Sequence, residues 1–438
     1  MTDLASHAPA LGTAPPRPTI SDRLKFYGTW LATAVVLLVL PQVFSSGGAL
    51  TTFSLVGISI IFALSYNILL GQTGMLSFGH AVYYGLGGFL AVHAINLVGF
   101  HKWPIPLPVI PLIGGFAGLG FALLLGWVST RRSGTVFAMI SLGVAELVAS
   151  SALILRSFFG GEAGVTANRT RLLRLFGFSF GPQIQIYYLV AAWTLLALIA
   201  MYALTRTPFG RMCNAVRDNP ERVQFVGYDP HVIRFIAFAF AGFFAGIAGA
   251  LSAINFEIAN SAYLGTQQSG VALFAAYIGG IGVFLGPVIG AILVSYLSLV
   301  LSDLSSVWQL YFGLIFIAVV AFAPGGIAGL LLRHRPIWRA GEIFRVLRTY
   351  LVAAPPTLVM LAGLVLGIEI VARHTLGSSD DPVLHPFGFA IDTNTPLSWA
   401  IAAVLTLGGL ALARLTWKSV ARAWDDAMTA ARARGYLA

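Results

Sequence analysis

The fold is decided at residues 205–234, TRTPFGRMCNAVRDNPERVQFVGYDPHVIR, a charged island in a chain that is otherwise almost continuously apolar. The island holds five arginines and three acidic residues, and apolar runs flank it at 185–204 and 235–256. A membrane-spanning helix needs about 20 mostly apolar residues. We therefore expect two spans to meet at the island, which lies on one face of a membrane and binds a soluble partner. The alternative is an ordinary solvated connecting loop.

The composition of the whole chain supports this interpretation. Of 438 residues, 58% are hydrophobic and only 10% are charged, with a mean hydropathy of +0.85, whereas soluble domains carry about 25% charged residues. The single cysteine, Cys213, excludes an internal disulfide and a multi-cysteine metal site. The net charge of +10 fits the basic bias of cytoplasmic loops better than binding to nucleic acid.

Twelve stretches are long and apolar enough to be read as spans. No strand alternation typical of a barrel is found, so we expect an all-α, polytopic integral membrane helical bundle with about ten core spans plus two C-terminal spans. The expected spans are 27–46, 50–70, 76–98, 108–130, 134–155, 185–204, 235–256, 268–284, 286–302, 307–324, 350–371 and 397–415. The pair within 268–302 is short and interrupted by glycine.

The distribution of basic residues predicts the orientation. With the N-terminus inside, 20 of the 26 lysines and arginines fall in cytoplasmic segments, as positive-inside placement requires. Both termini are then cytoplasmic, and so is the island. The segment 156–183, with four arginines on the outside, is the exception. We expect a cytoplasmic tail at 1–25, a core at 26–332 and a C-terminal extension at 333–438.

The island has local helix signals. Asn219 is a good N-cap, Pro220 suits the first helical position, and Gly227 suits the position after the last turn. These residues predict a short helix over 220–226, with Val223 and Val226 on one face, and a second short helix over 208–218.

Five stretches in chain order stand out besides the apolar spans. They are SYNILLGQTGMLSFGHAVYYGLGGF at 65–89, RRSGTVFAMISLGVAELV at 131–148 with GGEAGV at 160–165, the island with the span after it, IGGIGVFLGPVIGA at 278–291 and FAPGGIAGLL at 322–331. Together they resemble one family, the branched-chain amino acid (LIV-type) ABC importer permeases, over roughly residues 50–332.

This resemblance implies a translocating permease subunit, not an enzyme. Such a complex pairs two permeases, usually paralogous, with two cytoplasmic ATPase subunits and an extracytoplasmic solute-binding protein in the bacterial-type cytoplasmic (inner) membrane. The island then resembles the loop that couples ATPase closure to the spans, a rigid-body motion that a docked short helix can transmit. Its candidate coupling residues are Phe209, Gly210, Arg217, Glu221 and Gly227. For Arg217 and Glu221 the alternative is a pair of solvated charges.

ATP has to be used by other chains. A Walker A motif needs Gly-Lys-[Ser/Thr], and none of the three lysines, Lys25, Lys102 and Lys418, follows a glycine. We therefore expect this chain to bind no cofactor and no metal, to contact membrane lipid and to bind no nucleic acid.

Candidate translocation-pathway residues stand in the first glycine-rich break. Gln72, Ser77 and His80 interrupt apolar sequence beside several glycines. Broken helices in transporters offer free N–H and C=O groups to charged ends of substrates. The alternatives are that the glycines, including Gly79 and Gly85, allow close helix packing, and that His80 hydrogen-bonds a neighbouring helix.

Glu146 is a further pathway candidate because it lies well inside the span 134–155. A carboxylate at membrane depth is costly and is expected to face the bundle interior or water. Its alternative role is a structural hydrogen bond between helices. Glu369 is near the end of a span, and we expect it to extend to the membrane interface.

The extension at 333–438 is not covered by the resemblance. It adds a basic linker, two spans, an acidic external loop with Asp380, Asp381 and Asp392, and a basic tail. In the tail, 414–434, four apolar residues recur at helical spacing, which is typical of a helix lying on the membrane surface. They are Trp417, Val420, Trp424 and Met428.

Two other function classes fit this sequence less well. An ion-coupled secondary transporter acting alone needs membrane carboxylates, and Glu146 is essentially the one deep acid. A membrane enzyme needs a catalytic cluster, yet the eight histidines are scattered. The sequence therefore predicts an ATP-driven importer of branched-chain or other small neutral amino acids. Urea, amides and small carboxylates are the alternative substrates.

Overall fold

The computed structural model describes residues 20–174, 177–376, 383–384, 391–393 and 395–436. Arg17 of the expected N-terminal tail and Asp380 and Asp381 of the acidic loop lie outside the described residues. Ten helical segments of the described chain are long and apolar enough to cross a membrane. The chain is therefore an all-α, multi-pass membrane protein, as expected.

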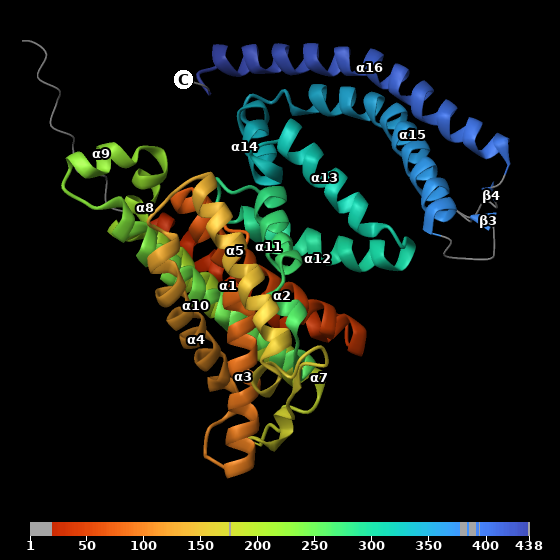
Figure 1. The fold of residues 1–438 in the computed structure, drawn as a ribbon. Helices are drawn as coiled ribbons and strands as arrows, with labels where there is room; N and C mark the ends of the chain where they lie inside the picture. Colours follow the sequence, from red (N-terminus) through yellow and green to blue (C-terminus); the bar gives the residue numbers. More distant parts are fainter. Residues whose placement is uncertain (1–19, 175–176, 377–382, 385–390, 394, 437–438) are drawn as a thin grey trace, which may run out of the picture.

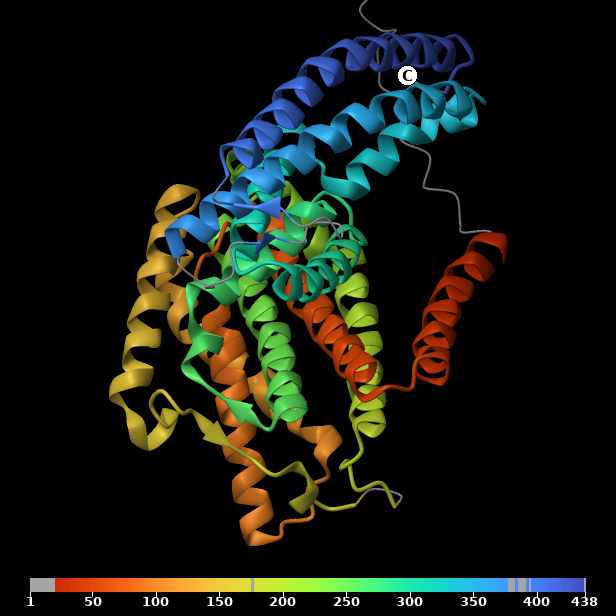
Figure 2. The ribbon, with the colours of Figure 1, turned by 90° about the vertical axis from the view of Figure 1, so that its right-hand side faces the viewer.

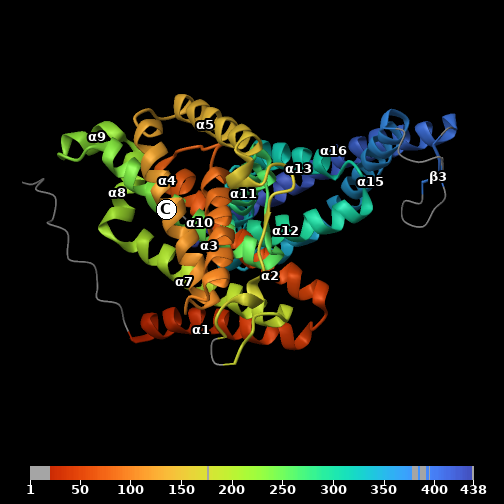
Figure 3. The same ribbon diagram turned by 60° about the horizontal axis from the view of Figure 1, so that its bottom comes forward.

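The first half of the chain contributes five long helices before the segment 156–183. They are α1 (Ile20–Val43), α2 (Gly47–Asn67), α3 (Ala81–His101), α4 (Ile110–Ser129) and α5 (Thr135–Ile154). A π-helical turn, η1 (Ile68–Gln72), continues α2, and a 3-10 turn, η2 (Leu107–Val109), precedes α4. Figures 2 and 3 show α1 at the edge of the bundle, next to α7.

The remaining helices follow that segment. They are α7 (Gln183–Arg206), α8 (Pro208–Asp218), α9 (Pro220–Phe225), α10 (Pro230–Phe256), α11 (Thr266–Gly279), α12 (Gly286–Leu304), α13 (Trp308–Phe322), α14 (Gly326–Arg339), α15 (Ile343–Leu376) and α16 (Pro396–Ala433). The expected span at 268–284 is only the 14 residues of α11, about 21 Å long at 1.5 Å per residue. Helix α11 is therefore too short to cross a hydrocarbon core about 30 Å thick. Its glycine-rich turn ends the helix at Gly279, so this span prediction was wrong.

Helix α10 is the centre of the bundle and packs against α2, α3 and α4 (Figures 1 and 3). The contact is close because glycines face one another. A side chain placed on Gly246 would overlap the carbonyl oxygen of Gly114 in α4, and one on Gly88 in α3 would lie 3.1 Å from the carbonyl oxygen of Gly249. Small residues let membrane helices approach closely, so these glycines serve packing.

The segment 156–183 is held to the end of α10. It contains α6 (Arg156–Phe159), η3 (Arg169–Arg171) and β1 (Val165–Thr166), and β1 pairs antiparallel with β2 (Ile258–Ala259), which is followed by η4 (Ser261–Leu264). Arg169 is only 9% exposed. Its guanidinium donates four hydrogen bonds to backbone carbonyls, at 2.9 Å to Phe180, 3.0 Å to Ile254, 3.0 Å to Asn255 and 3.1 Å to Gly181. Arg169, one of the four arginines that depart from the positive-inside distribution, thus stabilises the fold by binding backbone carbonyls.

The C-terminal extension is a long antiparallel pair, α15 and α16, standing to one side of the core (Figure 1). Its short strands β3 (Val383–Leu384) and β4 (Ile391–Asp392) pair between the helices. The sequence predicts that the apolar stripe of the tail faces a membrane surface, but three of its four residues pack against this chain and only Trp417, at 50%, is exposed. Val420 is buried, Trp424 stacks edge-on at 4.9 Å against His334 of α14, and Met428 packs in a cluster with Val346 of α15.

Candidate functional site

The island folds as two short helices, α8 and α9, and Asn219 caps α9 as expected. Thr207 caps α8 by accepting a hydrogen bond from the Gly210 N–H, and the Asn219 side chain caps α9 at 2.9 Å from the Arg222 N–H. Gly227 follows α9 with φ +90°, a left-handed conformation that suits glycine. Two hydrogen bonds at 2.8 and 3.2 Å, from Gly227 and the next residue, close the end of the helix, as in a Schellman turn.

Helix α9 presents apolar side chains to its surroundings. Val223 is 4% exposed and holds the helix to the rest of the chain, whereas Phe225 is 90% and Val226 is 69% exposed. Tyr228 and Glu221 are exposed as well. The prediction that Val223 and Val226 share one face was wrong, because α9 ends at Phe225 and the chain turns there. An exposed phenylalanine at the tip of a polar island is the kind of anchor that fills a partner's pocket.

Helix α8 attaches the island to the bundle. Phe209 lies 5.9 Å from the Phe240 ring of α10, ring centre to ring centre. Gly210 packs at the turn from α7, where a side chain would be 2.5 Å from a backbone carbonyl oxygen. Arg217 pairs with Asp218 at 2.9 Å and also donates a hydrogen bond to the Gly71 carbonyl oxygen in the π-helical turn of α2. The island is therefore bound directly to the end of a span.

Beyond this turn the chain runs without helix or strand from Gly74 to His80. Gly74 has φ +71° and lies against the Arg217 side chain. Non-helical backbone at membrane depth is tolerated where protein covers it, and Ser77 and His80 are fully buried. Neighbouring hydroxyls cap the start of α3: the Phe78 N–H donates to Ser141 at 3.0 Å and the Ala81 N–H donates to Ser269 at 2.9 Å.

His80 binds a neighbouring helix. Its Nε2 lies 2.9 Å from the Ser65 hydroxyl of α2, and its ring stacks on Phe62 at 5.4 Å. Gln72 and Ser77 each have a buried oxygen without a hydrogen-bond partner in the described structure. Gln72 is half-buried and Ser77 and His80 are buried, and none of the three lines the cavity described next.

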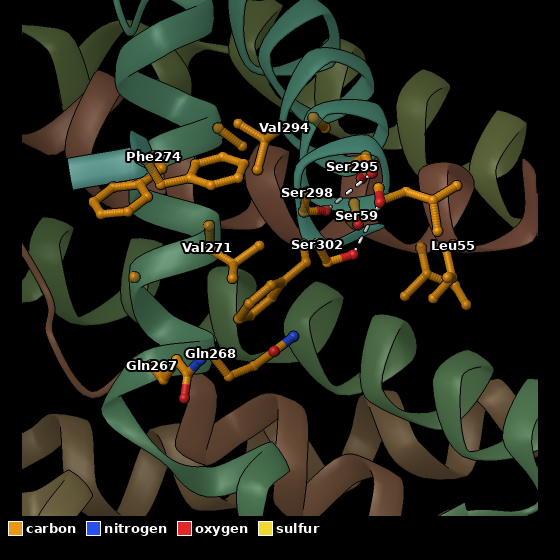
Figure 4. A pocket seen from close by; sticks show the side chains of 18 of the residues that line it. Leu55, Ser59, Gln267, Gln268, Val271, Phe274, Val294, Ser295, Ser298 and Ser302 are labelled. Atoms are coloured by element: carbon orange, nitrogen blue, oxygen red, sulfur yellow. Dashed lines mark hydrogen bonds between the residues drawn. The ribbon is translucent and has the colours of Figure 1, made fainter. Parts of the chain in front are cut away.

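A cavity of about 660 Å³ lies on the other side of Phe62, between α2, α11, α12 and α13. Most of its polar lining comes from three helices (Figure 4): Ser59 of α2, Gln267 and Gln268 of α11, and Ser295, Ser298 and Ser302 of α12. Thr52 of α2 and Gln309 of α13 add to it. None of the described residues that line it is charged. This volume is within the range of small-molecule sites, about 300–1,000 Å³. Hydroxyls and amides without charge suit a neutral solute.

Sequence reasoning missed this cavity, although two signals were present. Serines at 295, 298 and 302 follow helical spacing through the apolar run 286–302, and two glutamines precede the run at 268–284. The Ser298 and Ser302 hydroxyls donate to carbonyls of their own helix at 2.9 Å, so their lone pairs can still accept. His80 supports the cavity indirectly, because Phe62 stands between them.

The sequence predicts that Glu146 faces either the bundle interior or water, and the structure excludes the interior of this chain. It is exposed on the outer face of α5, in a stripe with Met139, Gly143 and Ser150, whereas Ala145 on the opposite face is buried. Span α5 is among the less buried ones. A carboxylate in the middle of a span is costly in lipid, so this stripe favours another protein or water as its neighbour.

Glu369 is half-buried and is bound to the hairpin of α12 and α13. Its carboxylate accepts hydrogen bonds from the Ser305 hydroxyl at 2.6 Å and the Tyr311 hydroxyl at 2.7 Å. Within the described residues, no cluster of three histidine, cysteine or acidic side chains is placed to hold a metal ion.

Comparison with known proteins gives a consistent result. The family described as the permease component of the branched-chain amino acid transport system matches residues 48–324. The chain is 25% identical to the high-affinity branched-chain amino acid transport system permease protein LivM of Escherichia coli, over 68% of this chain and 74% of LivM. It is 25% identical to LivH of Salmonella typhimurium, over 67% and 96% of the two chains.

A ribose permease is also similar. The ribose import permease protein RbsC of Haemophilus influenzae is 24% identical over 69% of this chain and 92% of its own length. No solved structure matches the chain. The matched region contains the island, the cavity and the buried His80 segment, and it ends before α15 and α16. The chain belongs to the permease-component family of branched-chain amino acid transport systems, and so is a membrane-embedded transport subunit rather than a catalytic enzyme.

Proposed function

We propose that this chain is one of two permease subunits of an ATP-driven importer of small neutral amino acids in a bacterial-type cytoplasmic membrane. The second permease is a paralogous chain, and two ATPase subunits act from the cytoplasm, one of them docked on the island. A solute-binding protein delivers the substrate on the other side. Both termini of the chain are cytoplasmic in this arrangement.

The observation that carries the proposal is the construction of the island. Phe225 is exposed at its tip, and Arg217 at its base binds Gly71 at the end of α2. Helix α2 also supplies Ser59 and Phe62 to the cavity wall. A partner that moves Phe225 therefore acts, through a short series of direct contacts, on the helix that lines the cavity. Transmission by rigid elements in contact is the physical basis of such coupling.

The coupling assignment is tested by Phe225→Asp. The substitution places a charge where the partner's pocket is apolar, so ATPase subunits should no longer copurify in mild detergent, while membrane insertion is unchanged. Phe178→Asp is the matched control, because Phe178 is also exposed but lies in the segment 156–183. Copurification of ATPases with Phe225→Asp at the parent level contradicts the assignment.

The substrate class follows from the cavity and the relatives. An uncharged lining of hydroxyls and amides accommodates a neutral solute, and LivM and LivH carry branched-chain amino acids in their names. RbsC makes ribose a second candidate. Uptake of labelled leucine, ribose, urea, an amide and a small carboxylate into proteoliposomes with the whole complex discriminates among them. Uptake without ATP but with an ion gradient would instead support a secondary transporter.

Glu146 belongs to the pathway in this proposal. Its outward stripe on α5 faces the second permease across a water-filled route, where a carboxylate can stay hydrated. Glu146→Leu should then lower uptake while assembly is retained. Labelling of a cysteine at position 143 by a membrane-impermeant maleimide reports directly whether water reaches this stripe.

A further inference from the structure

The extension touches the transport core at a chemically specific point. Glu369 of α15 accepts hydrogen bonds from Ser305 at 2.6 Å and Tyr311 at 2.7 Å. Both donors lie in the hairpin of α12 and α13, inside the family's matched region, whereas Glu369 is 45 residues beyond its end at 324. The contact therefore joins a segment outside the matched region to one inside it.

The two donors stand beside the cavity. Ser302 of α12 and Trp308, Gln309 and Phe312 of α13 line the cavity. Ser305 lies in the turn between those two groups, and Tyr311 lies next to Phe312 in sequence and is buried. A group that fixes Ser305 and Tyr311 consequently fixes the wall that α12 and α13 contribute.

The hairpin has few other supports on that side. Most described residues of α12 and α13 are exposed or only half-buried, and Figure 1 shows both helices extending away from the centre of the bundle toward α15. Ser305 also accepts a hydrogen bond from the Val307 N–H at 3.2 Å, so the carboxylate orders the turn itself. A carboxylate in an apolar span is retained where it has such partners.

We propose that Glu369 is a positioning residue through which the C-terminal extension holds the α12–α13 wall of the cavity and thereby sets the affinity for the transported solute. The proposal rests on the proposed function only in treating the cavity as the solute's route. Releasing Glu369 lets the hairpin move outward, which widens the cavity and weakens its contacts with the solute. Assembly with ATPases depends on the island and is not affected.

The test combines a structural and a functional measurement on the whole complex. Labelling with a maleimide is measured in a Cys213→Ala, Ser302→Cys background. Uptake of labelled leucine, measured in the Cys213→Ala background alone, gives KM and kcat. Glu369→Leu should raise the labelling rate and KM by about fivefold or more, with kcat within twofold. Glu369→Gln, whose amide oxygen still accepts both hydrogen bonds, should stay within twofold of the parent in both.

Further variants keep the result decisive. Tyr311→Phe removes one donor from the other side, and its effect should not add to that of Glu369→Leu. Glu342→Leu is the control, since Glu342 also belongs to the extension but pairs with Arg434 at 3.3 Å. Parent-like labelling and KM in Glu369→Leu and Tyr311→Phe would overturn the proposal. Labelling that responds while uptake proves independent of ATP would leave the wall contact standing and refute the ATP-driven function.

Discussion

Replacing Arg169 by methionine tests the energetic role of one buried arginine. The change keeps most of the side-chain length but removes the four hydrogen bonds that the guanidinium donates. Two of them go to the carbonyls of Phe180 and Gly181, and two go to the carbonyls of Ile254 and Asn255 at the end of α10. Burial lowers the pKa of the guanidinium, while the nearby Glu257 carboxylate acts in the opposite direction. The arginine nevertheless stays charged at any ordinary pH.

The magnitude follows from the carbonyls that lose their donor. Each buried carbonyl without a partner costs about 1–3 kcal/mol. Removing the guanidinium also removes its own desolvation cost, so the net loss is smaller than four such penalties. We expect a loss of about 3–4 kcal/mol, in line with the loss of one partner from a buried charged network. At about 2–4 °C per kcal/mol, the unfolding midpoint should fall by roughly 6–16 °C.

The assay is thermal unfolding in mild detergent, followed by the amount of monodisperse protein that survives heating. Arg174→Met is the matched control, because Arg174 lies in the same segment but is exposed; its midpoint should stay within about 1 °C of the parent. Arg169→Lys should fall between the two, since lysine keeps the charge but offers three donors from one point. An unchanged midpoint for Arg169→Met would refute the reasoning.

Three further predictions concern the island and the helix packing. Burial raises the pKa of the Cys213 thiol to about 12, so the thiolate fraction at pH 8 is about one in 10⁴; maleimide labelling should be very slow in the native protein and complete after denaturation. Gly246→Val should destroy monodisperse protein in size-exclusion chromatography because its side chain overlaps Gly114, whereas Gly120→Val, at an open site on α4, should not. Gly227→Pro cannot adopt φ +90°, so the protein should insert normally but show no ATP-driven uptake; parent-level uptake would contradict the coupling role.

The sequence was informative where local chemistry dominates. Hydrophobic length located most spans, and Asn219, Pro220 and Gly227 predicted the ends of α9 to within one residue. Backbone capping depends on neighbours in the chain, so a single sequence reveals it. The sequence also marked the segment 156–183 as unusual, because its four arginines depart from the positive-inside distribution of the other loops.

Contacts between distant segments could not be read in the same way. Glu146 and Glu369 are both acids in apolar spans, yet one faces outward and the other accepts hydrogen bonds from Ser305 and Tyr311. Which face a helix turns to its neighbours depends on packing that periodicity does not fix in uniformly apolar spans. For the same reason the cavity behind Phe62 was missed, although His80 next to it was singled out.

The π-helical turn at Ile68–Gln72 has a geometric consequence for α2. A π turn contains one residue more than the α-helical turn it replaces. Returning the segment to α-helical bonding would rotate everything beyond it by about 100° and shift it along the axis by about 1.5 Å. Arg217 binds the carbonyl oxygen of Gly71 within this segment. The island is therefore attached to α2 at its π-helical turn. A small movement of the island at this turn can be accommodated by a change in the helical register of α2.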